Sequence, residues 1–149
     1  MKDRLSIRIA KRSDLNAILQ LFVQAGIDDG NALSLSAAEH IFEVMKRYPH
    51  YKIYVSVLDR RIVGTFAILI MDNLAHMGAS SAIIEQVAVD PGLQRRGIGK
   101  AMMTFALALA KEHGCYKAML SSNLKRETAH KFYESLGFNR HGYSYAVDI

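Results

Sequence analysis

The sequence predicts one mixed α/β domain over residues 1–149, in which about four helices flank a mostly antiparallel sheet of about six or seven strands. Three observations lead to this fold class. Segments in which apolar and polar residues alternate, as in half-buried strands, recur along the chain. Between them lie segments whose apolar residues recur every three or four positions, as on one face of a helix. The first half is rich in adjacent strands, and the second half alternates strand and helix.

The chain begins with a predicted strand and two predicted helices. Residues 5–10 alternate apolar and polar side chains, which indicates a strand. Residues 13–26 have helical apolar spacing, with a serine suited to the N-cap and a glycine suited to the C-terminal cap. A second helix is expected over residues 34–48, where Ser34 or Ser36 could serve as N-cap and a proline follows.

Three strands are predicted next. Residues 51–58 and 62–71 are rich in β-branched and aromatic side chains and are separated by a short charged turn, which favours an antiparallel hairpin. Residues 72–80 have the composition of a loop. Residues 81–89 form another expected strand, ended by an Asp-Pro-Gly turn.

The second half alternates helix and strand. Residues 97–113 predict a strongly apolar helix that a glycine at position 114 terminates. A strand over residues 116–121, a helix over 127–136 and a final strand over 142–147 follow. This alternation favours a mixed sheet with helices on its faces.

The chain carries a formal charge of +5, with 19 Lys and Arg against 14 Asp and Glu. Basic residues and aromatic residues do not interleave as they do in many nucleic-acid-binding surfaces, so we do not expect nucleic acid as a partner. The local excess suits a small phosphorylated ligand better. It comes from two groups: Arg95, Arg96 and Lys100, and Lys125, Arg126 and Lys131.

Cys115 is the only cysteine, so the chain can form neither an internal disulfide nor a cysteine-based metal cluster. His113, His130 and His141 have no metal-ligand spacing, and we expect no metal cofactor. Residues 1–4 lack the apolar run of a signal peptide, and no stretch reaches the roughly 20 apolar residues of a membrane span. These features predict a cytoplasmic protein with no membrane partner.

The segment 87–100 runs from a predicted strand through a glycine-containing turn into a helix. Glycines allow close approach of a ligand to the backbone, and the free N–H groups of a helix's first turn attract anions. The spacing is neither that of a P-loop nor that of a dinucleotide-binding turn. A simpler interpretation is that Gly97 and Gly99 only permit tight packing and that Arg95 and Arg96 are a solvated pair.

Two motifs in this order resemble those of the GNAT N-acetyltransferase superfamily. Residues 94–99, Gln-Arg-Arg-Gly-Ile-Gly, match its Gln/Arg-x-x-Gly-x-Gly/Ala signature, and a Glu-x-Val-x-Val strand precedes them. Residues 121–138 match the family's closing Asn…Ala-x-x-Phe-Tyr-x-x-x-Gly-Phe pattern. Within the superfamily the second motif is similar to that of small-molecule enzymes, including aminoalkylphosphonate acetyltransferases.

The resemblance implies that acetyl-CoA is the co-substrate and that the sheet splays between its fourth and fifth strands. The backbone of the fourth strand would bind pantetheine, and the glycine-rich turn would bind pyrophosphate, with Asn123 and the last helix nearby. The N–H of Val87 would face the thioester oxygen. The residues implied for cofactor binding are Val87, Ala88, Val89, Gln94, Arg95, Arg96, Gly97, Ile98, Gly99, Lys100, Asn123, His130 and Tyr133.

Three side chains are candidates for the chemistry of amine acetylation. The resemblance implies that Tyr133 is the general acid, although it could instead be a packed core tyrosine. Glu85 lies two residues before Val87, on the same face of a regular strand, and is a candidate base acting directly or through one water. It could also bind an ammonium group without deprotonating it, or pair with an arginine. His76 is a candidate for the acceptor pocket or an ordinary surface-loop histidine.

We therefore expect direct transfer of an acetyl group to a primary amine of a small molecule. Acetylation of a protein lysine or N-terminus is an alternative, and a CoA-binding sensor without turnover is another. A homodimer is expected only by analogy with the family.

Overall fold

The computed structural model describes residues 4–149. Residues 1–3, part of the segment that lacks a signal-peptide pattern, lie outside the described range. The chain forms two compact units, Met1–Met119 and Leu120–Ile149. Within the described range, no helix has both the length and the apolar character needed to cross a bilayer.

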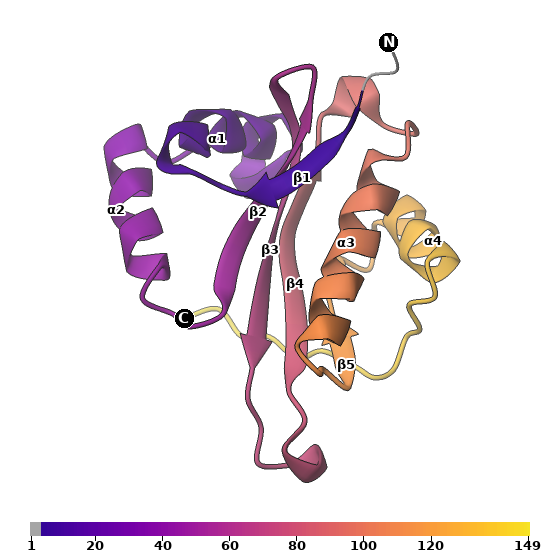
Figure 1. The fold of residues 1–149 in the computed structure, drawn as a ribbon. Helices are drawn as coiled ribbons and strands as arrows, with labels where there is room; N and C mark the ends of the chain where they lie inside the picture. The colour runs from indigo at the N-terminus through magenta and orange to yellow at the C-terminus, as the bar shows by residue number, and fades with distance from the viewer. Residues whose placement is uncertain (1–3) are drawn as a thin grey trace. The chain divides into compact units, whose positions relative to one another are not determined.

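The first unit is built around a five-stranded sheet whose strand order follows the chain (Figure 1). The first four strands pair antiparallel, and the fifth pairs parallel to the fourth. The strands are β1 (Ser6–Ile9), β2 (Tyr51–Leu58), β3 (Arg61–Met71), β4 (Ser81–Val89) and β5 (Lys117–Met119). The mixed, mostly antiparallel sheet confirms the predicted fold class.

Three helices of the first unit cover the two faces of this sheet. Figure 1 shows α1 (Leu15–Gln24) and α2 (Leu35–Met45) on one side and α3 (Ile98–Glu112) on the other. Ser34 is the N-cap of α2, because its Oγ accepts a hydrogen bond from the Ala37 N–H at 3.3 Å. Gly26 and Gly114, the predicted terminators of α1 and α3, follow these helices with left-handed φ of 74° and 73°, which confirms both. The predicted serine cap of α1 is wrong, because Ser13 lies in a 3₁₀ turn and Asp14 is the N-cap.

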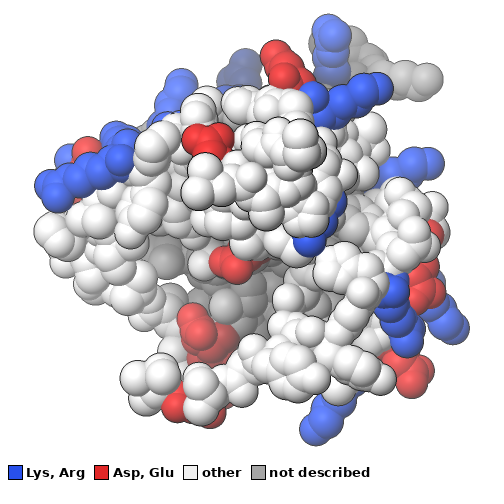
Figure 2. Space-filling view, turned by 90° about the horizontal axis from the view of Figure 1, so that it is seen from below, with Lys and Arg blue, Asp and Glu red and all other residues white. Residues whose placement is uncertain are grey.

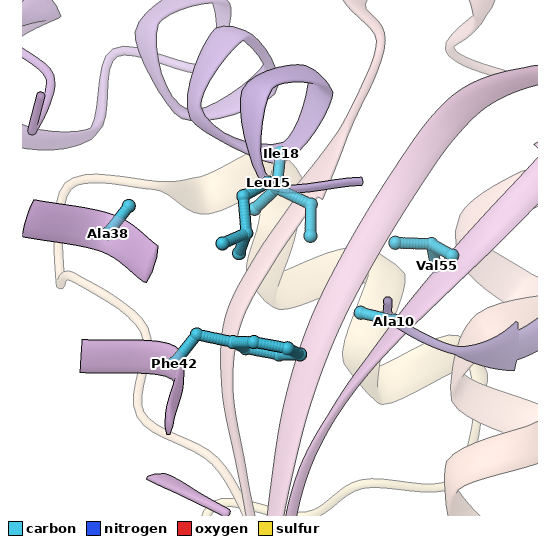
Figure 3. Packing of buried hydrophobic residues seen from close by; sticks show 6 residues of the cluster. All are labelled: Ala10, Leu15, Ile18, Ala38, Phe42 and Val55. Atoms are coloured by element: carbon cyan, nitrogen blue, oxygen red, sulfur yellow. The ribbon is translucent and has the colours of Figure 1, made fainter. Parts of the chain in front are cut away.

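Apolar side chains of α1 and α2 pack on one face of β2. The six buried residues of this cluster point toward one another in Figure 3. Each large side chain buried in this way contributes about 1.5–3 kcal/mol. The cluster comprises Ala10, Leu15, Ile18, Ala38, Phe42 and Val55. On the opposite face of β2, Tyr54 contacts Phe105 of α3, with ring centroids 5.3 Å apart.

Gly64 in β3 allows α3 to lie close to the sheet. A Cβ at this position would be 2.6 Å from the Met102 sulfur and 3.4 Å from Ile98 Cγ2. Any larger residue would therefore press on the first turns of α3. The close approach fixes the position of the α3 N-terminus relative to the sheet.

The second unit contains one helix, α4 (Glu127–Ser135), as predicted. The strand predicted over residues 142–147 is wrong, because residues 139–149 form no strand in the structure. Tyr143, Tyr145 and Val147 are exposed, so the alternating pattern buries no apolar face. A strand needs a neighbouring strand to satisfy its backbone, and the pattern alone could not show whether one exists. The described residues consequently form five strands rather than six or seven.

Candidate functional site

The backbone of β4 is unpaired along one edge for most of its length. β5 pairs only with Ser81–Ile83, whereas β4 continues to Val89. On the β5 side, therefore, β4 from Ile84 onward faces no strand among the described residues of the first unit. Such an edge can accept an extended ligand that carries amide groups, as though the ligand were another strand.

A β-bulge interrupts β4 next to this open edge. Glu85 pairs with Ala67 and Ala88 pairs with Thr65, so three steps along β4 match two along β3. The extra residue leaves Gln86 with a φ of 54°, a left-handed conformation that is unfavourable for a residue other than glycine. Sequence reasoning missed this bulge because an unbroken β-rich run with no glycine gives no sign of it.

The bulge corrects the predicted orientation of Glu85. A regular strand would place Glu85 and Val87 on one face, but the pairing places Glu85 and Ala88 opposite β3 residues that share a face. The argument that linked Glu85 to Val87 by alternation is therefore wrong. Glu85 lies on the α1–α2 side, in a row with Ala67 and with Ile53, which packs on the apolar cluster of Figure 3.

The turn that connects β4 to α3 is held by Asp90. Asp90 Oδ1 accepts a hydrogen bond from the Gly92 N–H at 2.9 Å, and Oδ2 lies 2.5 Å from the Arg61 guanidinium. Two left-handed residues, Arg95 at φ 66° and Gly97 at φ 81°, then turn the chain into α3. Ile98, which is only 4% exposed, anchors the start of the helix in the core.

The first turn of α3 presents free backbone donors. The first hydrogen bond at the start of the helix runs from the Ala101 N–H to the Gly97 carbonyl at 3.0 Å. The N–H groups of Ile98, Gly99 and Lys100 precede it and have no partner within the helix. Together with the positive end of the helix dipole, they suit a phosphate.

The basic side chains of this turn are available to an anion. Arg95, Arg96 and Lys100 are exposed, and none of them forms an ion pair with another residue in the described range 4–149. Figure 2 shows the molecule from below, where acidic side chains lie near the middle of the face and Lys and Arg mostly around its margin. The three basic residues of the turn, next to the free N–H groups of α3, suit a small anionic ligand.

We expect Gly97→Ala to weaken acetyl-CoA binding. A Cβ at Gly97 would meet no atom within 4 Å, so the substitution creates no clash, but the φ of 81° makes the native backbone unfavourable for alanine by roughly 1–2 kcal/mol. The KM for acetyl-CoA should rise severalfold while kcat changes little. Gly142→Ala is the matched control, because Gly142 also lies in open space and has no left-handed φ. Equal acetyl-CoA KM values in both variants would contradict this role of the turn.

In the second unit, Asn123 and His130 shape the turn that precedes α4. Asn123 Oδ1 accepts a hydrogen bond from the Lys125 N–H at 2.9 Å. The carbonyl oxygen of Asn123 accepts from the Arg126 N–H and, at 2.8 Å, from His130 Nε2. Both residues thus have a structural role in addition to the cofactor contacts that the sequence predicts for them.

Tyr133 lies on α4 among aromatic rings. Its centroid is 5.2 Å from that of Phe132 and 5.8 Å from that of Phe138. Burial raises the pKa of the Tyr133 phenol, and Arg126 opposes part of this change. The phenol is therefore protonated at neutral pH, as a proton donor must be. The aromatic packing also agrees with the alternative of a structural tyrosine.

His76 does not lie near Glu85. It belongs to a 3₁₀ turn, His76–Gly78, between β3 and β4, and its ring stacks on Tyr116 with centroids 4.2 Å apart. Glu85 is four residues beyond the start of β4, which corresponds to about 13 Å of strand. The exposed, stacked ring favours the surface-loop interpretation.

Tyr51, which sequence reasoning missed, is electrostatically coupled to Glu85. Burial raises the pKa of the Tyr51 phenol, and the Glu85 carboxylate and Tyr48 raise it further. Tyr48 meets Tyr51 edge to face, with centroids 5.9 Å apart. The proximity of Tyr51 to Glu85 depends on strand register across β3, which no local sequence pattern reveals.

Cys115 is half-buried, and burial raises the pKa of its thiol, which disfavours the nucleophilic thiolate. Within residues 4–149, no three His, Cys, Asp or Glu side chains gather closely enough to hold a metal ion. Within the first unit, the candidate site is thus the open edge of β4, the first turn of α3 and the Glu85 carboxylate on β4.

Comparison with known proteins identifies this arrangement. Residues 15–138 match the model of the acetyltransferase (GNAT) family. The glucosamine 6-phosphate N-acetyltransferase of Trypanosoma brucei brucei is 30% identical over 146 residues, 97% of this chain and 96% of the relative. A crystal structure of a T. brucei acetyltransferase is 29% identical with a TM-score of 0.84, covering 98% of this chain and all of its own. A transcriptional regulator from Bacillus halodurans C-125 is 25% identical with a TM-score of 0.90, covering 98% of this chain and all of its own.

The family match extends from α1 to the aromatic residue that follows α4, and so includes both motifs on which the resemblance rested. The named relative that aligns over nearly its whole length acts on glucosamine 6-phosphate, not on an aminoalkylphosphonate, which corrects the finer resemblance. The chain therefore belongs to the GNAT family of acetyl-CoA-dependent N-acetyltransferases.

Proposed function

We propose that this enzyme acetylates the primary amine of a small phosphorylated amino compound, with glucosamine 6-phosphate as the first candidate. The observation that carries the proposal is the 30% identity to a glucosamine 6-phosphate N-acetyltransferase over 97% of this chain and 96% of that one. Alignment over whole chains includes the loops that bind the acceptor, whereas a shared motif for acetyl-CoA does not. Glucosamine 6-phosphate also agrees with the basic character of the chain.

The residues around the open edge fit acetyl-CoA. The unpaired backbone of Val87, Ala88 and Val89 is suited to the amides of pantetheine, and the first turn of α3 with Arg95 and Arg96 is suited to pyrophosphate. Acetyl-CoA supplies the acetyl group as a thioester, a form that is reactive toward a neutral amine.

Glu85 and Tyr133 would carry the proton transfers. Glu85, exposed on the α1–α2 face and without an ion pair in the described range, would accept a proton from the acceptor ammonium. Tyr133, kept protonated by burial, would give its proton to the leaving sulfur. Neither task requires a covalent acyl-enzyme, which agrees with a Cys115 thiol that is not activated.

The test is release of free thiol from acetyl-CoA in the presence of a panel of amines. We expect glucosamine 6-phosphate to be turned over with a higher kcat/KM than glucosamine, an aminoalkylphosphonate, a polyamine or a lysine peptide. Preference for the lysine peptide would favour protein acetylation. Binding of CoA without thiol release from any amine would favour a sensor and contradict the proposal.

A further inference from the structure

We propose that Tyr51 and Tyr48, together with Glu85, form the subsite that holds the acceptor's ammonium group before its proton is removed. This inference rests on the proposed function of amine acetylation, and it names side chains that bind the amine rather than those that transfer protons. The set of Tyr48, Tyr51 and Glu85 is called the ammonium subsite below.

Strand register places two members of the ammonium subsite, Tyr51 and Glu85, on one face of the sheet, and Tyr48 contacts Tyr51 from the turn before β2. Tyr51 pairs with Leu69 of β3, and Leu69 pairs with Ile83 of β4. The row two residues along is Ile53, Ala67 and Glu85. Tyr51 and Glu85 are thus two strands and two residues apart, which gives a Cα separation of roughly 12 Å. The two long side chains can lean toward each other across the buried, small side chain of Ala67.

The Glu85 carboxylate is exposed next to buried residues of the same face. Ala88, which follows it on this face of β4, is 3% exposed, and Ala67, the partner of Glu85 on β3, is 1% exposed. No arginine or lysine of the described range forms an ion pair with Glu85. A carboxylate in this position is available to an external ammonium group.

The two tyrosines supply the aromatic part of the subsite. Tyr48 and Tyr51 meet at an interplanar angle of 89°, so the face of one ring meets the edge of the other. Tyr48 is 52% exposed, which leaves part of its ring open to solvent. The electron-rich faces of phenol rings attract cations, and a carboxylate on the far side of the same cation adds to that attraction. An amine that enters between them is held as an ammonium ion.

The two tyrosines of the subsite lie away from the proposed acetyl-CoA site. Tyr51 begins β2, two strands away from the open edge of β4, and Tyr48 lies in the turn before β2. Substitutions there should change binding of the amine without changing binding of acetyl-CoA. A structural role of the tyrosines in folding would change both.

The test compares Tyr51→Leu and Tyr48→Leu with Tyr51→Phe and with Tyr54→Phe in steady-state kinetics. Loss of either ring should raise the KM for the amine about five- to thirtyfold, the size of a partly desolvated cation–π contact. The KM for acetyl-CoA and kcat should stay within about twofold of wild type. Tyr51→Phe keeps the ring and should retain most of the wild-type KM. Tyr54→Phe is the matched control, because Tyr54 lies on the same strand with its ring on the α3 side.

A second measurement distinguishes loss of the subsite from misfolding and from a wrong choice of acceptor. Calorimetric titration compares the binding of glucosamine 6-phosphate with that of glucose 6-phosphate, which lacks the amine. Wild type should prefer the amine, and Tyr48→Leu, a substitution of an exposed residue, should remove this preference. If another amine of the panel is the acceptor, the titration uses that amine and its hydroxyl analogue instead of glucosamine 6-phosphate and glucose 6-phosphate. That result would refute glucosamine 6-phosphate as the acceptor, and the ammonium subsite would be tested with the amine that reacts. Wild-type amine KM in both leucine variants would overturn the subsite, and so would the absence of any amine that binds or reacts.

Discussion

Tyr133→Phe is expected to lower kcat about a hundredfold and to leave the KM for acetyl-CoA nearly unchanged. General acid catalysis contributes typically 10²–10⁴-fold, and the phenol can be replaced by a phenyl ring without loss of packing volume. The rings of Phe132 and Phe138 pack around Tyr133, so phenylalanine should keep these contacts. A loss confined to kcat is the mark of an interaction made in the transition state.

The control for this variant is Tyr143→Phe. Tyr143 is 93% exposed and lies outside every helix and strand, so its hydroxyl should not affect turnover. Equal melting temperatures of wild type and Tyr133→Phe would show that folding is unaffected. If Tyr133→Phe turned over at the wild-type rate, Tyr133 would be a packing residue, as its aromatic neighbours would then suggest.

The pH profile provides an independent check on Tyr133. Because burial raises the pKa of its phenol, the proton donor should remain in place through the neutral range and be lost only above the ordinary pKa of tyrosine. Loss of the Tyr133 proton should therefore cause no decline of wild-type activity in the neutral range. Any decline seen there should also be present in Tyr133→Phe. A decline near neutrality that disappears in Tyr133→Phe would contradict the raised pKa of the phenol.

The elements of the fold that local patterns define were predictable from the sequence. The α2 cap at Ser34, the hairpin of β2 and β3, and the limits of β4 depend on residues adjacent in the chain. The final strand was not predictable, since the alternation in residues 142–147 says nothing about whether a neighbouring strand is available. Local patterns report propensity, and pairing is a property of the whole sheet.

The candidate site divides in the same way. The turn at residues 94–99 was identifiable because an anion site at a helix N-terminus needs residues that are contiguous in sequence. The bulge at Gln86 and the proximity of Tyr51 to Glu85 were not, because both depend on how β4 pairs with β3 and β3 with β2. The proposed acceptor side is thus assembled from distant segments, and a motif cannot describe it.

Glu85→Gln is expected to lower kcat about a hundredfold at neutral pH, with a loss that shrinks as pH rises. Glutamine keeps the shape of the side chain and removes its ability to take a proton. At high pH the bound amine is already neutral and needs no base, so wild type and variant should converge. Measurement of kcat and the amine KM across the pH range, with acetyl-CoA saturating, tests this expectation.

Comparison of the two kinetic constants separates the roles of Glu85. A loss in kcat that does not change with pH would mean that no proton moves to this carboxylate. A change in the amine KM alone would leave Glu85 as a binding group and assign proton removal to water or to another side chain. If Glu85 both holds and deprotonates the amine, Glu85→Gln changes kcat and KM, whereas Tyr51→Leu changes only KM. That difference distinguishes binding of the ammonium ion from removal of its proton on the same face of the sheet.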